Sequence, residues 1–147
     1  MVKIAYYDAS FLCKLVFPEK DSEKVMIHAN QMHHLICSMH GRAEFAATCN
    51  RKMREDSATK VQVEKAIQQL DKDTKSEFIK WLPLTEKHLA HVEEIFRKAP
   101  KDLFLRASDA LHLAAAAEHG VKEIFSNDRH LLTAASLFGL KGKNLLI

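Results

Sequence analysis

Two acidic residues stand shortly after apolar segments that are typical of buried strands. Asp8 directly follows the apolar run at residues 2–7, and Asp128 follows the run at residues 121–125. An aspartate at such a position is common as the N-cap of the next helix, because its side chain accepts hydrogen bonds from free backbone N–H groups. Two carboxylates at one edge of a sheet also repel each other unless a cation or a proton lies between them. Capping therefore explains either residue alone, and a shared functional site is the alternative.

Two further acidic residues lie in helical segments with little other polarity nearby. Glu44 lies in the segment RAEFAA, and Asp109 lies near the start of the most apolar helical segment, residues 105–119. Glutamate is a good helix former, and an aspartate in the first turn of a helix interacts favourably with the helix dipole. Each of these two residues therefore also has an ordinary structural explanation when it is taken separately.

One shared site explains all four acids with a single cause. Carboxylates without histidine or thiolate partners are ligands of the kind that Mg²⁺ and Mn²⁺ prefer. Converging carboxylates that bind such ions commonly hydrolyse phosphodiesters, because the ion lowers the pKa of a bound water and offsets charge on the attacking and leaving oxygens. The sequence therefore predicts one catalytic, metal-binding site that is formed by Asp8, Glu44, Asp109 and Asp128.

These acids can meet only if the fold brings distant segments to one edge of a sheet. Segments typical of strands and of amphipathic helices alternate along the chain, and a polar connection is expected at residues 71–77. Such alternation is typical of a parallel sheet with helices on both faces, whose ligands bind at the carboxyl ends of the strands. The predicted strands are residues 2–7, 35–39, 78–84, 121–125 and 144–147, and the predicted helices are residues 11–16, 21–32, 40–53, 60–70, 85–96, 105–119 and 129–138.

The composition is that of one globular domain, which we expect to span residues 1–147. With 47% hydrophobic and 28% charged residues the chain is too apolar for a disordered protein, and four glycines are few for an all-β protein. The net charge of +3 is compatible with a polyanionic partner, although an ordinary solvated surface explains it more simply. Three cysteines without a CxxC pair, no signal-peptide pattern and no long apolar run predict a cytoplasmic protein without membrane contact.

Four short motifs occur in a characteristic order and at characteristic separations. They are YDASFLCKL at residues 7–15, RAEFA at 42–46, LRASDALHLAA at 105–115 and FSNDRHLL at 125–132. Together they resemble the PIN-domain ribonucleases, in particular the VapC-like toxins of type II toxin–antitoxin pairs, over nearly the whole chain. The resemblance implies a three-layer α/β/α sandwich with a central parallel sheet. It also implies a Mg²⁺- or Mn²⁺-dependent endoribonuclease whose metal ligands are Asp8, Glu44, Asp109 and Asp128.

The resemblance further implies RNA as the substrate, a cognate antitoxin protein that blocks the cleft, and a homodimer. Ser10 and the pair Ser126-Asn127 match small polar positions beside the acids of the family, and we expect them to contact the substrate. Lys14 and Arg106 are the basic residues that we expect to meet RNA phosphates. The alternative is that these cations neutralise the carboxylates or face solvent.

Three other residues have weaker grounds for a role. Arg42 and Arg129 also lie near the expected cleft, and His112 lies on the same helix side as Asp109, whose carboxylate it could orient. A histidine on a helix is more often incidental. The segment that leads to Glu44, SMHGR, is less rich in hydroxyl groups than the family pattern, which leaves the choice of substrate and partner open.

Two other classes of function remain as alternatives. A non-catalytic module of the same fold would bind RNA or a protein partner and keep the acids for structure alone. A phospho-accepting receiver domain also places acids at strand ends, but it needs adjacent acids after the first strand. The segment YYDAS supplies only one acid there, which disfavours the receiver domain.

Overall fold

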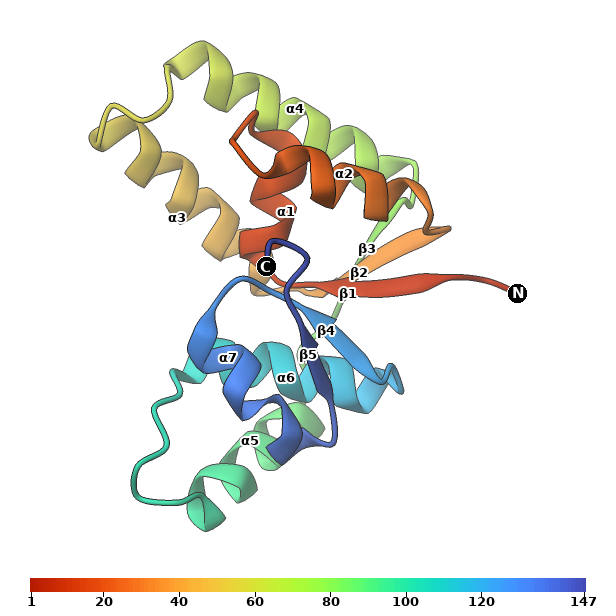
Figure 1. The fold of residues 1–147 in the computed structure, drawn as a ribbon, viewed down its shortest axis with the longest axis vertical. Coiled ribbons are helices and arrows are strands. Elements are labelled where there is room, and N and C mark those ends of the chain that lie inside the picture. The colour runs from red at the N-terminus through yellow and green to blue at the C-terminus, as the bar shows by residue number, and fades with distance from the viewer.

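The computed structural model describes residues 1–147 and contains one sheet of five strands (Figure 1). The strands are β1 (Ile4–Tyr7), β2 (His34–Ser38), β3 (Ile79–Leu82), β4 (Glu123–Phe125) and β5 (Lys141–Lys143). All neighbouring strands are parallel, in the order β3-β2-β1-β4-β5. The chain therefore begins in the middle of the sheet, builds one side and then crosses to the other. Sheets of this kind bind ligands where the connections diverge, which here is between β1 and β4.

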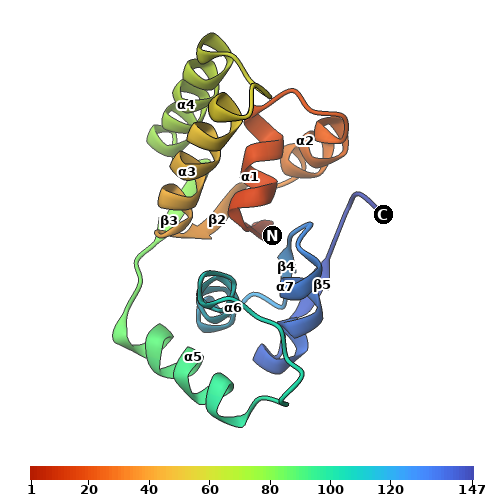
Figure 2. The ribbon, with the colours of Figure 1, turned by 90° about the vertical axis from the view of Figure 1, so that its left-hand side faces the viewer.

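Helices cover both faces of the sheet, and the predicted three-layer α/β/α sandwich is confirmed. The helices are α1 (Ala9–Val16), α2 (Ser22–Asn30), α3 (Gly41–Arg54), α4 (Lys60–Lys75), α5 (Glu86–Lys98), α6 (Ala107–His119) and α7 (Arg129–Ala134), followed by the 3₁₀ turn η1 (Ala135–Phe138). Figures 1 and 2 show α1 to α4 on one face and α5 to α7 on the other. Tyr7 belongs to the apolar cluster of the first layer and Tyr6 to that of the second. Successive side chains of a strand point to opposite faces, so β1 serves both clusters.

The two strand-end aspartates fix where the next helices begin. Asp8 is the N-cap of α1, and its Oδ1 accepts a hydrogen bond from the backbone N–H of Phe11 at 3.1 Å. Asp128 is the N-cap of α7, and its Oδ1 accepts from the N–H groups of His130 at 2.9 Å and Leu131 at 3.1 Å. Because β1 and β4 are neighbours, both capping carboxylates lie at the same edge of the sheet.

The last strand was predicted at residues 144–147, and this prediction is wrong. The strand is β5, which pairs with β4 through its backbone and so needs no apolar side chains. Gly142 allows a close approach to the neighbouring helix, because a Cβ there would lie 3.0 Å from the carbonyl oxygen of Leu132. Leu145 and Leu146 follow the strand and pack against the apolar cluster of the first layer.

The polar connection predicted at residues 71–77 is also wrong for most of its length, because α4 continues to Lys75. Tertiary contacts at the end of α4 account for this. Thr74 donates a hydrogen bond from Oγ1 to the carbonyl oxygen of Leu70 at 2.8 Å, and its Oγ1 accepts one from Trp81 Nε1 at 3.1 Å. The polar side chains of this segment therefore lie on an exposed helix face.

The structure also describes the state of the cysteines and the character of the helices. Cys13, Cys37 and Cys49 are buried and free. None of the helices combines the length and the apolar character that crossing a membrane requires.

Candidate functional site

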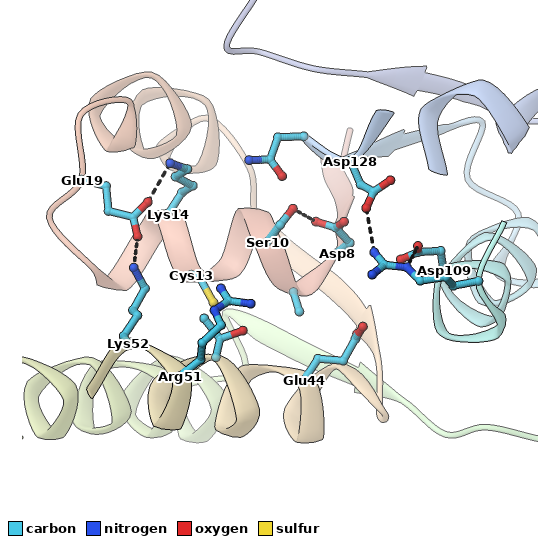
Figure 3. Close-up of a pocket in the computed structure, with 14 residues that line it drawn as sticks. Asp8, Ser10, Cys13, Lys14, Glu19, Glu44, Arg51, Lys52, Asp109 and Asp128 are labelled. Atoms are coloured by element: carbon cyan, nitrogen blue, oxygen red, sulfur yellow. Dashed lines mark hydrogen bonds and ion pairs between the residues drawn. The ribbon is translucent and has the colours of Figure 1, made fainter. Parts of the chain in front are cut away.

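A cavity of about 400 Å³ opens at the ends of β1 and β4 (Figure 3). The four acids that the sequence singles out all line it: Asp8, Glu44, Asp109 and Asp128. They reach the cavity from β1, α3, α6 and the turn before α7, so the fold brings together residues from four separate segments. The other lining residues are Ala9, Ser10, Cys13, Lys14, Glu19, Thr48, Arg51, Lys52, Arg106 and Asn127.

Asp8 is held by hydroxyl groups on both of its oxygens. Ser10 Oγ donates to Oδ1 at 2.6 Å, and Ser126 Oγ donates to Oδ2 at 2.5 Å. Asp8 is 4% exposed, and burial raises the pKa of its carboxyl group, while the hydrogen bonds from the two serines oppose that rise. Asp8 therefore caps a helix and also lines the cavity, so the two explanations of this residue do not exclude each other.

Arg106 links the carboxylates of Asp109 and Asp128. Its Nε lies 3.2 Å from Asp109 Oδ2, and its Nη2 lies 2.9 Å from Asp128 Oδ2. Burial and the charge of Asp128 raise the pKa of Asp109, and the charge of Arg106 opposes this rise. The Arg106 side chain is 69% exposed, so the cation approaches this pair from the solvent side.

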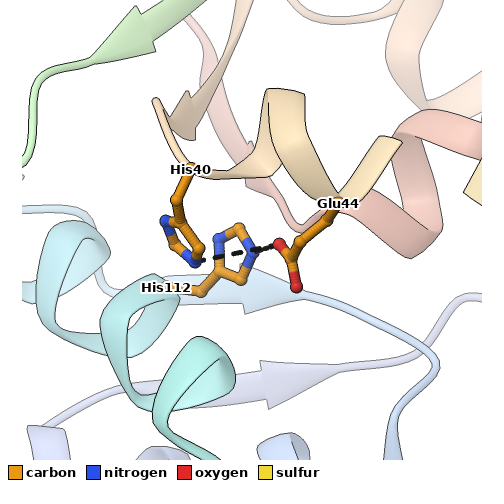
Figure 4. A group of neighbouring side chains, drawn as sticks. All are labelled: His40, Glu44 and His112. Carbon is orange, nitrogen blue, oxygen red and sulfur yellow. Dashed lines mark hydrogen bonds and ion pairs between the residues drawn. The ribbon is translucent and has the colours of Figure 1, made fainter. Parts of the chain in front are cut away.

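Glu44 is held by α6 and not by the aspartates (Figure 4). Ser108 Oγ donates to Glu44 Oε2 at 2.6 Å, and His112 Nε2 forms a hydrogen bond with Oε1. Burial would raise the pKa of Glu44, but the hydrogen bond and the charge of His112, together with the hydrogen bond from Ser108, outweigh it and hold the pKa below its ordinary value. The sequence left two interpretations of His112: that it orients Asp109, or that it is incidental. It contacts Glu44 instead, because it lies one helical turn after Ser108 and shares its face of α6.

The other end of the cavity is basic. Lys14 Nζ lies 2.6 Å from Glu19 Oε2, and Lys52 Nζ contacts the other oxygen of the same carboxylate. Arg51 also lines this end of the cavity and forms no ion pair. The sequence interpretation missed Glu19 in the connection after α1 and Arg51 and Lys52 on α3, because charged residues give the same pattern whether they bind a ligand or face solvent.

Comparison with models of protein families identifies the family of this chain. The model of the PIN domain matches residues 5–137. The chain belongs to the PIN domain family. This confirms the resemblance that the four sequence motifs carry.

Solved structures share the fold of this PIN domain at low sequence identity. A chain of the crystal structure of VapBC2 from Rickettsia felis, bound to a DNA fragment from their promoter, has a TM-score of 0.65 and 13% identity, over 96% of this chain and 98% of that one. A chain of FitAB bound to the IR36 DNA fragment has a TM-score of 0.67 and 15% identity, over 98% of this chain and 96% of that one. Comparison with curated protein sequences gives no match.

The residues expected to contact a substrate are divided by the structure of the PIN domain. Four of them line the cavity: Ser10, Lys14, Arg106 and Asn127. Ser126 has no exposed surface and lies behind Asp8, so it can position that carboxylate but cannot touch a ligand. Arg42 and Arg129 do not line the cavity, and the guanidinium of Arg42 lies 6.0 Å from the ring centroid of Trp81.

Proposed function

We propose that this PIN domain is a Mg²⁺- or Mn²⁺-dependent endoribonuclease in which Asp8, Glu44, Asp109 and Asp128 form the catalytic metal site. The observation that carries the proposal is the position of Arg106, whose guanidinium lies between the carboxylates of Asp109 and Asp128. Two acids that share a buried edge need a positive charge nearby, and an exposed arginine supplies it in this structure. A divalent cation at the same place would answer the same need.

The donor groups of the cavity fit a hard cation. The acidic end offers carboxylate and hydroxyl oxygens, which are the preferred ligands of Mg²⁺ and Mn²⁺. Cys13 is the only thiol in the lining, and burial raises its pKa to about 12, so it stays a protonated thiol and not a thiolate ligand. The site therefore favours a metal of the oxygen-binding class.

Each group of residues has a defined task in this mechanism. Asp8, Asp109 and Asp128 would hold the ion together with Glu44, and the serine hydroxyls at Asp8 keep its oxygens in place. When bound, the ion would lower the pKa of a water and offset charge on the phosphate. Glu44 is kept ionised by its hydrogen bonds and can accept a hydrogen bond from a water in the cavity.

The basic end of the cavity supports RNA as the substrate. Lys14, Arg51 and Lys52 lie beside the acidic end within one cavity, so a chain of phosphates could contact these cations while one phosphodiester reaches the carboxylates. We propose that these residues bind phosphate groups, which steers the strand without reading its sequence.

The protein partners of this chain are proposed from the complexes in which the similar structures were solved. The similar structures are of VapBC2 and FitAB, and we propose that this chain is likewise the toxin of a type II toxin–antitoxin pair, with a cognate antitoxin and a homodimeric form. The three free, buried cysteines support a reducing compartment, so we propose that the protein acts in the cytoplasm. Light scattering of the purified protein tests the dimer, and a monomer at all concentrations would contradict it.

RNA cleavage with and without the ion tests the proposed function. We expect cleavage with Mg²⁺ or Mn²⁺, no cleavage in excess EDTA, and recovery when Mn²⁺ is added back. Mn²⁺ should also raise the unfolding temperature, because binding at 100 times its Kd stabilises a protein by about 2.7 kcal/mol. The matched pair of variants is Asp109→Asn in the cavity and Asp71→Asn on the exposed face of α4. Only Asp109→Asn should lose cleavage and the thermal shift.

Two results would contradict the proposal. Undiminished cleavage in EDTA would exclude the metal, and full activity of Asp109→Asn would exclude this cavity. RNA binding without any cleavage and without a Mn²⁺-dependent thermal shift would favour the alternative, a non-catalytic PIN module.

A further inference from the structure

The hydrogen bonds behind Glu44 form a chain that ends in the core of the protein. Glu44 Oε1 contacts His112 Nε2, and the other ring nitrogen of His112, Nδ1, lies 2.6 Å from the hydroxyl of Tyr6. The Tyr6 oxygen accepts a hydrogen bond from the backbone N–H of Ser38 at 2.9 Å. Tyr6 and Ser38 have no exposed surface, and His112 is 1% exposed. The far end of the chain is therefore fixed by β1 and β2.

The partners in this chain determine where each proton lies. The backbone N–H of Ser38 can only donate, so the Tyr6 oxygen accepts there. The Tyr6 hydroxyl also lies 2.6 Å from His112 Nδ1 and holds the imidazole ring from behind. The ionised Glu44 carboxylate can only accept, so the Nε2 atom of His112 carries the proton between them.

The neighbouring His40 also carries a proton on Nε2, because that nitrogen faces an acceptor. Its Nε2 lies 2.9 Å from the carbonyl oxygen of Ser108, which can only accept, so this nitrogen carries a proton. Its Nδ1 accepts a hydrogen bond from the Ser38 hydroxyl at 2.8 Å. The ring of His40 packs against that of His112, with centroids 4.1 Å apart.

The protons on the two Nε2 atoms decide whether the cluster in Figure 4 can bind a metal ion or holds the carboxylate of Glu44. One ligand atom from each of His40, Glu44 and His112 lies within 4.8 Å of the others, a spacing that could hold a metal ion. A histidine binds a metal through a nitrogen that has a free lone pair. The Nε2 atoms of both histidines carry protons in this hydrogen-bond pattern, so the cluster is built to hold a carboxylate and not an ion.

We propose that His112, held from behind by Tyr6, is a positioning residue that clamps Glu44 at the wall of the cavity together with Ser108. His112 and Ser108 project from α6, and Glu44 projects from α3, so the clamp joins the two helical layers at the edge of the sheet. It fixes both oxygens of Glu44 from one side and leaves their other lone pairs toward the cavity. This inference rests on the proposed nuclease function, since the role of Glu44 in cleavage comes from there.

Substitutions at His112 separate positioning from packing. His112→Leu fills the same buried space but donates no hydrogen bond, and we expect kcat to fall about 10- to 100-fold, as for other groups that orient metal-site residues, with KM nearly unchanged. His112→Gln can place an N–H near the lost Nε2 and should recover most of kcat. His119→Leu, at the exposed end of the same helix, is the matched control and should cleave like the wild type. Equal losses in His112→Leu and His112→Gln would overturn the positioning role.

The proton on Nε2 of His112 can be detected by ¹⁵N NMR of the imidazole nitrogens, without substrate or metal. We expect a proton on Nε2 of His112 in the wild type and a mixture of ring forms in Tyr6→Phe, which lacks the hydroxyl. A wild-type His112 without a proton on Nε2 would overturn the proposal, as would Zn²⁺ binding that disappears in both His40→Gln and His112→Gln. A wild type that cleaves no RNA overturns the proposed function, whereas the NMR spectrum still decides the clamp.

Discussion

The acidic and the basic ends of the cavity hold their charges in different ways. Asp8 and Asp109 at the acidic end are 4% and 6% exposed. Asp8 is fixed by serine hydroxyls and a backbone N–H, groups that cannot move without disturbing β1, β4 or α1. At the basic end, Lys14 and Lys52 share the single carboxylate of Glu19, which lies in the connection between α1 and α2.

This difference matches two different demands on a nuclease. A metal ion requires ligands held to within a fraction of an ångström, and groups fixed by the sheet edge provide this. A flexible polyanion requires cations that can adjust, and lysines that are held by one side chain can be released by its movement. We therefore propose that the acidic end carries the chemistry and the basic end binds the strand, and four variants test this difference.

Asp8→Asn should have the largest effect. Asparagine caps α1 as well as aspartate does, so the fold stays intact while the charge is lost. We expect kcat to fall by more than about 100-fold, because even the groups that orient metal ligands contribute about 10- to 100-fold. Single-turnover cleavage with Mn²⁺ measures kcat, and filter binding should show that affinity for RNA is retained. Normal cleavage by a folded Asp8→Asn protein would remove the acidic end from the chemistry.

The double substitution Lys14→Gln/Lys52→Gln should show the opposite pattern. We expect RNA binding to weaken about 10-fold at 0.1 M salt, and the slope of log K against log salt to become shallower by about 1.4, or about 0.7 for each lost phosphate contact. The rate at saturating RNA should stay close to that of the wild type. Lys72→Gln, on the exposed face of α4, is the control. An unchanged salt slope would mean that the basic end does not meet phosphates.

Arg106→Gln tests whether Arg106 and a divalent ion compete for the same place between Asp109 and Asp128. Removing the guanidinium from Asp109 and Asp128 leaves their charge uncompensated, so Mn²⁺ should bind about 2- to 5-fold more tightly, which corresponds to an exposed ion pair of about 0.5–1 kcal/mol. Isothermal titration calorimetry measures the Kd. Weaker Mn²⁺ binding in this variant would show that Arg106 supports the metal site and does not occupy its place.

The smallest effect is expected for Glu19→Gln, on stability. Burial raises the pKa of Glu19, but Lys14 and Lys52 together outweigh burial and hold the pKa below its ordinary value. A lowered pKa means that Glu19 stabilises the fold above its unfolded-state pKa, and that this contribution disappears as the pH falls through the folded-state pKa. Glu19→Gln should lower the free energy of unfolding at pH 7 by about 0.5–1 kcal/mol, and this difference should shrink as the pH falls through the folded-state pKa of Glu19. Urea unfolding of the variant and the wild type at pH 7 and at lower pH measures this difference. A difference that does not change with pH would contradict the ion-pair account.

The sequence predicted the layers of the fold because burial leaves a pattern in it. The runs that became β1, β2, β3 and β4 are apolar since each is packed between two layers of helices. The segment KGK of β5 has no such pattern, because this strand is fixed by backbone pairing with β4 and by the close approach at Gly142. The end of α4 was missed for a related reason, since its polar residues face solvent and its stability comes from a contact with Trp81.

The sequence likewise predicts some residues of the candidate site and not the contacts between its layers. Asp8 and Asp128 could be found because strand ends are places where ligands bind, and Arg106 because it precedes an acid-bearing helix. The clamp on Glu44 could not be found, because His112 and Ser108 meet it across two layers and helical periodicity only says which residues share a face. The contact of Lys52 with Glu19 likewise joins α3 to a distant connection, and no local pattern records it.

Anomalous diffraction from crystals soaked in Mn²⁺ tests the central claim most directly. The account predicts a peak in the cavity at about 2.1 Å from carboxylate oxygens of Asp8, Asp109 or Asp128, with the Arg106 side chain moved away from the pair that it links here. No peak at these carboxylates, or a peak only between His40 and His112, would contradict it.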